Sequence, residues 1–192
     1  MINKLRHLLR AKRGFTLVET LVAVFILMTS IAAPLTVASR ALMTALVAKD
    51  QITAFYLAQD AVEYIRFARD TNKLVAADWL TGQGGTGTGI DLTNCISSNG
   101  CYLDSTSQNP ITPTACATAC STPLASGSKY LLKSNTGQFA YSGSPTIYVR
   151  KVTITPIAGT VDEVLLTVYV YWADTGYVTR QVVIKENLFN WQ

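Results

Sequence analysis

The N-terminal part of the chain carries one long apolar run. From Thr20 to Ser39 there is no charged side chain, and about 20 apolar residues are what a helix needs to cross a bilayer core. We therefore expect residues 15–40 to form a membrane-spanning helix. Glu19 lies at the start of this segment. An acidic side chain at mid-membrane costs about 2.5 to 3.5 kcal/mol, so its presence suggests a specific partner.

The following segment, residues 41–72, keeps a helical period but becomes amphipathic. Its apolar positions recur at spacings of three and four residues, namely Ala54, Leu57, Ala58, Ala61, Ile65 and Ala68. Polar side chains such as Gln59 and Glu63 fall on the opposite side. We expect this segment to continue the first helix and to pack its alanine-rich stripe closely against a sheet. Pro34 lacks a backbone donor and clashes with the preceding turn, which predicts a bend or local unwinding.

The C-terminal part, residues 129–192, has the two-residue alternation of β-strands. In the segment 164–172 one face carries Val164, Leu166, Val168, Val170 and Trp172. Residues 146–155 and 177–186 are predicted to flank it, with a turn at 174–176 and shorter strands at 129–133 and 138–141. We expect an antiparallel meander. The fold class is therefore α+β, with a long N-terminal helix packed on a C-terminal antiparallel sheet.

Residues 73–128 are rich in Gly, Ser, Thr, Asn and Pro, a composition typical of loops. The stretch 82–89 contains five glycines, and glycine clusters can cradle phosphates. However, it is neither a G-x-x-x-x-G-K-[S/T] motif nor a G-x-G-x-x-G motif flanked by a strand and a helix. We interpret it as an exposed loop and keep nucleotide binding as a minor alternative.

The same segment contains all the cysteines of the chain: Cys95, Cys101, Cys116 and Cys120. On the outer side of a membrane, four cysteines in a loop with little core of its own predict two disulfides, for which three connectivities exist. The short separations slightly favour the local pairs, 95 with 101 and 116 with 120. A four-thiolate zinc site is the alternative, although the spacings are not those of paired C-x-x-C motifs.

Five basic residues precede Gly14, namely Lys4, Arg6, Arg10, Lys12 and Arg13. Because positive residues remain on the cytoplasmic side, they place the N-terminus inside and the rest of the chain outside. A conventional secretory signal should end in a small-residue cleavage site, and Ser39–Ala41 is a poor candidate for one. An ordinary single-span anchor would explain the apolar run but neither Gly14 nor Glu19.

The stretch Lys12–Glu19, with the sequence KRGFTLVE, resembles the processing site of type IV prepilins and type II secretion pseudopilins. The resemblance implies cleavage after Gly14 by a prepilin peptidase, which removes residues 1–14 as a cytoplasmic leader. It further implies N-methylation of the new terminal Phe15. Glu19 would then be the fifth mature residue and act in assembly, and Pro34 would be a point where the helix adapts during assembly.

The pattern of the C-terminal strands is similar to that of V-type minor pilins and I-type pseudopilins. The implied fold is the pilin-like fold, and the implied function is that of a minor pilin or pseudopilin in a type IV pilus-like or type II secretion filament. The implied partners are other pilin or pseudopilin subunits, the prepilin peptidase, the membrane platform of the assembly machine and, before assembly, the lipid bilayer. The chain would cross the inner membrane once, with its N-terminus inside, and then enter an extracellular or periplasmic filament.

Charge and composition argue against several other functions. The formal net charge of the chain is +4, but loss of the five basic leader residues leaves 11 basic against 12 acidic residues, so no basic patch for nucleic acid is expected. The single histidine, His7, leaves with the leader. We therefore expect no enzyme, no metal site and no cofactor.

Two alternative functions remain open at this point. One is a major pilin that forms the body of the filament. The other is a surface-anchored adhesion module, in which the strand aromatics Tyr148, Tyr169, Tyr171, Trp172 and Tyr177 recognise a ligand. We favour simple cross-strand packing for these aromatics.

Overall fold

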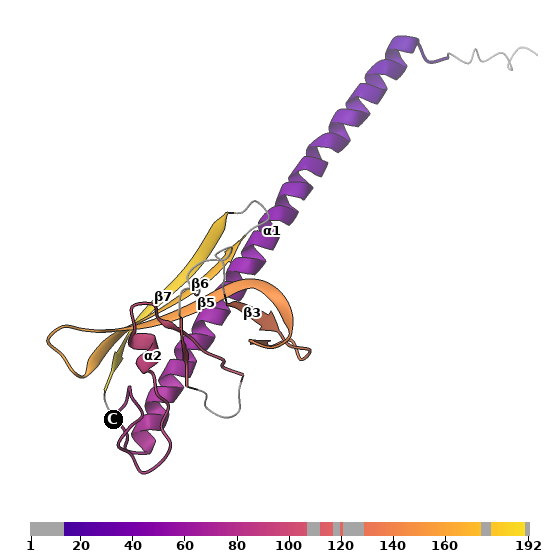
Figure 1. The fold of residues 1–192 in the computed structure, drawn as a ribbon. Coiled ribbons are helices and arrows are strands. Elements are labelled where there is room, and N and C mark those ends of the chain that lie inside the picture. Colours follow the sequence, from indigo (N-terminus) through magenta and orange to yellow (C-terminus); the bar gives the residue numbers. More distant parts are fainter. Residues whose placement is uncertain (1–13, 107–111, 117–119, 121–128, 174–177, 191–192) are drawn as a thin grey trace, which may run out of the picture. The chain divides into compact units, whose positions relative to one another are not determined.

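The computed structural model of the chain describes residues 14–106, 112–116, 120, 129–173 and 178–190. The chain divides into two compact units, Met1–Ala48 and Lys49–Gln192. The long helix α1, Leu17–Leu74, begins in the first unit and ends in the second, and a short helix α2, Thr93–Ile96, lies in the second (Figure 1).

Helix α1 is assigned without interruption through Pro34. The helix of the single chain is therefore continuous at this proline, and bending or local unwinding during assembly stays a prediction. A proline removes only one backbone donor, and the backbone hydrogen bonds of the turns on either side keep the chain helical through Pro34. The helix also begins two residues later, and ends two residues later, than residues 15 and 72.

Within the described residues the sheet has seven strands, and all of their pairings are antiparallel. Three long strands follow one another as a meander: β5 (Ser144–Pro156), β6 (Glu163–Ala173) and β7 (Thr179–Phe189). The other edge of β5 pairs with β3 (Tyr130–Lys133) and β1 (Cys101–Tyr102). The outermost short strands are β4 (Phe139–Ala140) and β2 (Thr114–Ala115).

The core of the second unit lies between α1 and the inner face of the sheet. All six positions of the predicted helical stripe are buried, with exposed fractions of 5% or less. The five predicted inward positions of β6 are also buried, at 3% or less. The alanines of the stripe are fully buried. The structure thus confirms the α+β fold, with the long helix packed on the antiparallel sheet.

The strand boundaries differ from the prediction mainly at β7. This strand runs to Phe189, three residues beyond the predicted end, because its pairing with β6 continues as far as Glu163↔Phe189. The predicted turn at 174–176 lies outside the described residues. Short strands occur at both predicted places, as β3 and β4.

The glycine-rich stretch is exposed from Gln83 to Thr88, as expected. Its flanks, however, contribute large side chains to the core, namely Trp79, Ile90, Leu92 and Leu103. Buried Asn72 organises this return of the chain. Its Nδ2 donates to the Trp79 and Ile90 carbonyl oxygens at 3.1 and 2.9 Å, and its Oδ1 accepts from the Ile90 N–H at 2.6 Å. This segment therefore packs into the core although its composition is typical of loops, and the Asn72 amide hydrogen-bonds to its backbone.

Candidate functional site

The junction that the sequence singled out, Gly14–Phe15, lies immediately before α1. Thr16 caps the helix, because its Oγ1 accepts the Glu19 N–H at 3.3 Å and its carbonyl oxygen accepts the Thr20 N–H at 3.2 Å. A threonine at the cap followed three residues later by glutamate is the capping-box pattern. The start of the helix is therefore encoded in the same residues that form the candidate processing motif.

The Gly14–Phe15 bond lies in non-helical, exposed backbone. Phe15 is 77% exposed, and a Cβ atom built on Gly14 would meet no atom within 4 Å. A larger side chain at position 14 is thus compatible with the fold. Any effect of such a substitution on processing would report on recognition and not on folding.

Glu19 lies in the first turn of α1 and is exposed. A carboxylate at this end of a helix is favoured by the helix dipole. Among the residues that the structure describes, no basic side chain forms an ion pair with it.

Helix α1 contains an 18-residue window with a mean hydropathy of 2.3, of which no residue is buried. By length and composition it can cross a membrane. Hydroxyl groups in this segment donate to backbone carbonyl oxygens three or four residues earlier in the helix, so they need no external acceptor. These hydroxyl groups belong to Thr20, Thr29, Ser30, Thr36 and Ser39. Internal satisfaction of polar groups is what a bilayer core requires. Pro34 lies within this same exposed segment.

The cysteines of the loop segment form disulfides, as the sequence predicted for an exported segment. Cys95 on α2 is bonded to Cys101 on β1, and Cys116 is bonded to Cys120. Among the described residues no cysteine is free. The Cys116 N–H also donates to the Gly100 carbonyl oxygen at 2.9 Å, so the two bridges lie on neighbouring backbone segments.

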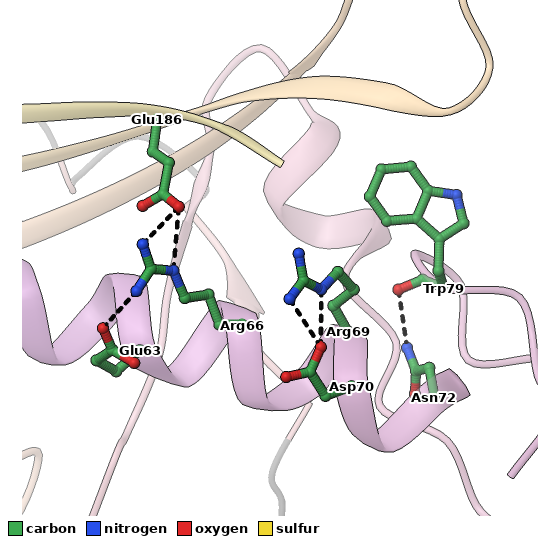
Figure 2. Close-up of polar contacts among 7 residues, drawn as sticks. All are labelled: Glu63, Arg66, Arg69, Asp70, Asn72, Trp79 and Glu186. Atoms are coloured by element: carbon green, nitrogen blue, oxygen red, sulfur yellow. Dashed lines mark hydrogen bonds and ion pairs between the residues drawn. The ribbon is translucent and has the colours of Figure 1, made fainter. Parts of the chain in front are cut away.

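The contacts between helix and sheet include an ion pair between charged groups far apart in the sequence. Arg66 on α1 donates from Nε and Nη2 to Oε1 of Glu186 on β7, at 3.0 and 2.6 Å, and from Nη1 to Glu63 at 2.7 Å (Figure 2). The hydrogen bond to Glu186 is the main cause that raises the pKa of Arg66. Asp70, which is close to Arg66 in sequence, pairs instead with Arg69.

A second charged contact is more deeply buried. Arg150 on β5 is 1% exposed and donates to the Leu57 and Leu103 carbonyl oxygens, each at 2.9 Å, and to Asp60 Oδ2 at 2.6 Å. It therefore joins the sheet, the helix and the segment after β1. No local pattern marks Arg150 for this role, because its partners lie 47 to 93 residues away.

Tyr148 completes the polar contacts between β5 and α1. Its hydroxyl donates to Asp50 Oδ1 at 3.2 Å, and its ring contacts those of Phe139 and Trp172. Burial raises the pKa of Tyr148 to about 12, so it remains a donor at physiological pH. Tyr148 and Trp172 are thus core side chains, whereas Tyr169 and Tyr171, whose rings stack at 5.8 Å, lie on the other face of β6. The remaining predicted aromatic, Tyr177, lies outside the described residues.

An apolar membrane-length helix that begins just after an exposed glycine, and then packs on an antiparallel sheet, is the arrangement of a pilin-type subunit. Residues 9–33 match the prokaryotic N-terminal methylation motif. This match supports assignment of the chain to the type IV pilin and pseudopilin-type family, whose members are structural subunits. No curated protein and no solved structure matches the chain.

The motif also carries general implications for partners and location. It implies processing by a prepilin peptidase and assembly with other pilin-type subunits. Together with the apolar helix, it fits a membrane-anchored precursor.

Proposed function

We propose that this chain is a minor pilin or pseudopilin, processed between Gly14 and Phe15, methylated at the Phe15 amine, and withdrawn from the inner membrane into a type IV pilus-like or type II secretion filament. The observation that carries the proposal is the exposed glycine placed directly before a capped, membrane-length helix with a carboxylate in its first turn. A prepilin-type peptidase acting at the membrane edge needs such a small, accessible residue.

In this proposal Glu19 directs assembly. In a filament, a carboxylate and a terminal ammonium removed from water would each be strongly penalised if left alone. Pairing Glu19 with the methylated Phe15 amine of a neighbouring subunit offsets both penalties and sets the axial register of the helix. Pro34 has no backbone N–H, so one helical hydrogen bond is missing within the span. The helix unwinds at this point once its surroundings change from lipid to neighbouring helices.

The experiment that tests the proposal is mass spectrometry of the mature N-terminus in cells with the assembly system. We expect a chain that begins with N-methylated Phe15. In the Gly14→Val protein, whose fold has room for the added methyl groups, the leader should remain attached. Normal processing of Gly14→Val, or a wild-type chain that begins after residue 39, would contradict the assignment.

A major pilin carries the same N-terminal features, and copy number separates the two roles. If the chain is a minor subunit, quantitative mass spectrometry of sheared filaments should find it at a small fraction of another pilin-type subunit. If it forms the bulk of the filament protein, the minor-subunit proposal is wrong and the major-pilin alternative holds.

A further inference from the structure

A cleft of about 460 Å³ opens beside α1 in the second unit. Helix α1 contributes Tyr56, Leu57 and Asp60 to its walls, and the opposite wall comes from Ser105, Gln138 and Phe139. The volume lies in the range of small-ligand pockets, with an apolar lining and a few convergent polar groups.

Two donors hold the Asp60 carboxylate through the same oxygen atom. Its Oδ2 accepts hydrogen bonds from Arg150 Nη1, at 2.6 Å, and from the Ser105 hydroxyl. Within the described part of the chain no donor reaches Oδ1, although the Asp60 side chain is 45% exposed. A carboxylate has about four lone-pair sites, so Oδ1 retains its capacity to accept.

The buried arginine does not satisfy the rest of this carboxylate. Two of the three hydrogen bonds that Arg150 makes go to the Leu57 and Leu103 carbonyl oxygens, and only one goes to Asp60. Arg150 therefore positions Asp60 through Oδ2, while Oδ1 has no donor among the described residues. Among the described residues that line the cleft, Asp60 is the one with a charged side chain.

Two aromatic residues line the same cleft as Asp60. Tyr56, 65% exposed, and Phe139 both line the cleft. An ionised acceptor together with aromatic faces is the combination that recognises cations with an apolar stem, through a charge-assisted hydrogen bond and cation–π attraction. The lysine or arginine side chain has this chemistry, with an apolar stem and a charged head.

We propose that this cleft binds the lysine or arginine side chain of a neighbouring pilin-type subunit. The identity of the partner, a pilin-type subunit, rests on the proposed filament function. Charge complementarity favours this occupant, and copies of the chain themselves present exposed lysines, for example Lys133 and Lys185. The cationic head group lies against Asp60 Oδ1, and the stem lies between Tyr56 and Phe139.

The first test measures binding of a side-chain analogue to the full chain in detergent micelles by ligand-observed NMR. n-Butylguanidinium should bind about tenfold more tightly than the neutral isostere n-butylurea. Tyr56→Ala should weaken this binding about two- to fivefold, the range of an exposed cation–π contact. Phe67→Ala, which removes another exposed aromatic of α1 outside the cleft, is the matched control. Equal binding of both analogues, or an unchanged affinity in Tyr56→Ala, would overturn the site.

The second test identifies the source of the side chain. With a photoreactive p-benzoylphenylalanine at position 56, we expect cross-linked peptides in assembled filaments that join this chain to a pilin-type subunit. Changing the nearest lysine or arginine of that peptide to glutamine should lower the cross-linking yield several-fold. Cross-links to lipid alone, or a yield that does not depend on the basic residue, would exclude the subunit as partner.

Failure of this inference and failure of the proposed function give different results. A chain that is processed and assembled normally but binds no n-butylguanidinium refutes only the cleft. A chain whose leader is never removed refutes the proposed function, and the micelle assay still reports on the cleft independently.

Discussion

Arg150 shows how one side chain can connect distant parts of the fold. It is almost fully buried, and within the described residues it donates three hydrogen bonds to groups outside its own strand: the carbonyl oxygens of Leu57 and Leu103, and the carboxylate of Asp60. A buried guanidinium costs desolvation free energy, which the acceptors at Nη1 and Nη2 offset, whereas the buried Nε has no partner among the described residues. Its contribution is therefore to fix how α1, β5 and the segment after β1 meet.

Replacing this side chain gives a prediction at the residue scale. Arg150→Met should lower the free energy of unfolding by about 2 to 4 kcal/mol, because two buried carbonyl oxygens and one carboxylate oxygen lose their donor. Lys151→Met, on the opposite face of the same strand, should change it by less than about 0.5 kcal/mol. Urea unfolding of the full chain in micelles, followed by tryptophan fluorescence, measures both.

A double substitution shows whether the loss comes from the ion pair. Once Asp60→Asn has removed the carboxylate, Arg150→Met should cost less than it does alone, since the pair no longer exists. Fully additive effects would show that Arg150 acts through the two carbonyl oxygens only.

At the scale of elements, the disulfides stabilise a segment that has little regular structure. Helix α2 has four residues, and β1 and β2 have two each. The bridge from Cys95 to Cys101 joins α2 to β1 with both cysteines fully buried, and β1 in turn pairs with β5 through Cys101↔Val152. The bridge thus attaches this segment to the central strands.

We expect non-reducing peptide mapping of the exported chain to find the local pairs and no free thiol among Cys95, Cys101, Cys116 and Cys120. In the loop-entropy model the closed loop from 95 to 101 contributes about 2.4 kcal/mol and the loop from 116 to 120 about 2 kcal/mol. Replacing both cysteines of the first pair by alanine should therefore destabilise the chain more, because that pair also belongs to the hydrophobic core cluster. Four free thiols with stoichiometric zinc would disprove the disulfide assignment.

At the scale of the whole molecule, we predict that the exposed carboxylate of Glu19 acts in the proposed assembly. No basic side chain of the described residues pairs with it, and the first turn of α1 forms through Thr16 without the Glu19 side chain. The fold and the membrane span therefore do not depend on this group. Its contribution depends on what the helix meets in the filament.

Accordingly, Glu19→Ala and Glu19→Gln should insert into the membrane and be cleaved normally, but should enter filaments at least about tenfold less than the wild type, as expected for a lost pair worth 1.4 kcal/mol or more. The measurement is the ratio of variant to wild-type subunit in sheared filaments at matched membrane levels. Glu63→Ala removes an exposed carboxylate of the same helix beyond the apolar segment and serves as control. An unchanged ratio for Glu19→Ala would remove this residue from the mechanism.

The sequence by itself determined the features that depend on local periodicity. The apolar run, the three- and four-residue stripe of α1 and the alternation of β6 are each readable within one element, because a helix or strand presents its faces at a fixed period. The candidate processing site was likewise readable, since its residues are contiguous. These patterns gave the α+β fold and the pilin-type assignment.

The tertiary structure decided the contacts between groups far apart in the chain. Arg66 binds Glu186, 120 residues away, and not its neighbour Asp70. Asn72 organises a loop whose composition suggested only exposure, and Asp60 becomes an open acceptor because Arg150 reaches it from β5. No local period encodes such pairs: each depends on the register of the strands and on which face of the helix the sheet covers, so packing of the whole domain is needed to bring them together.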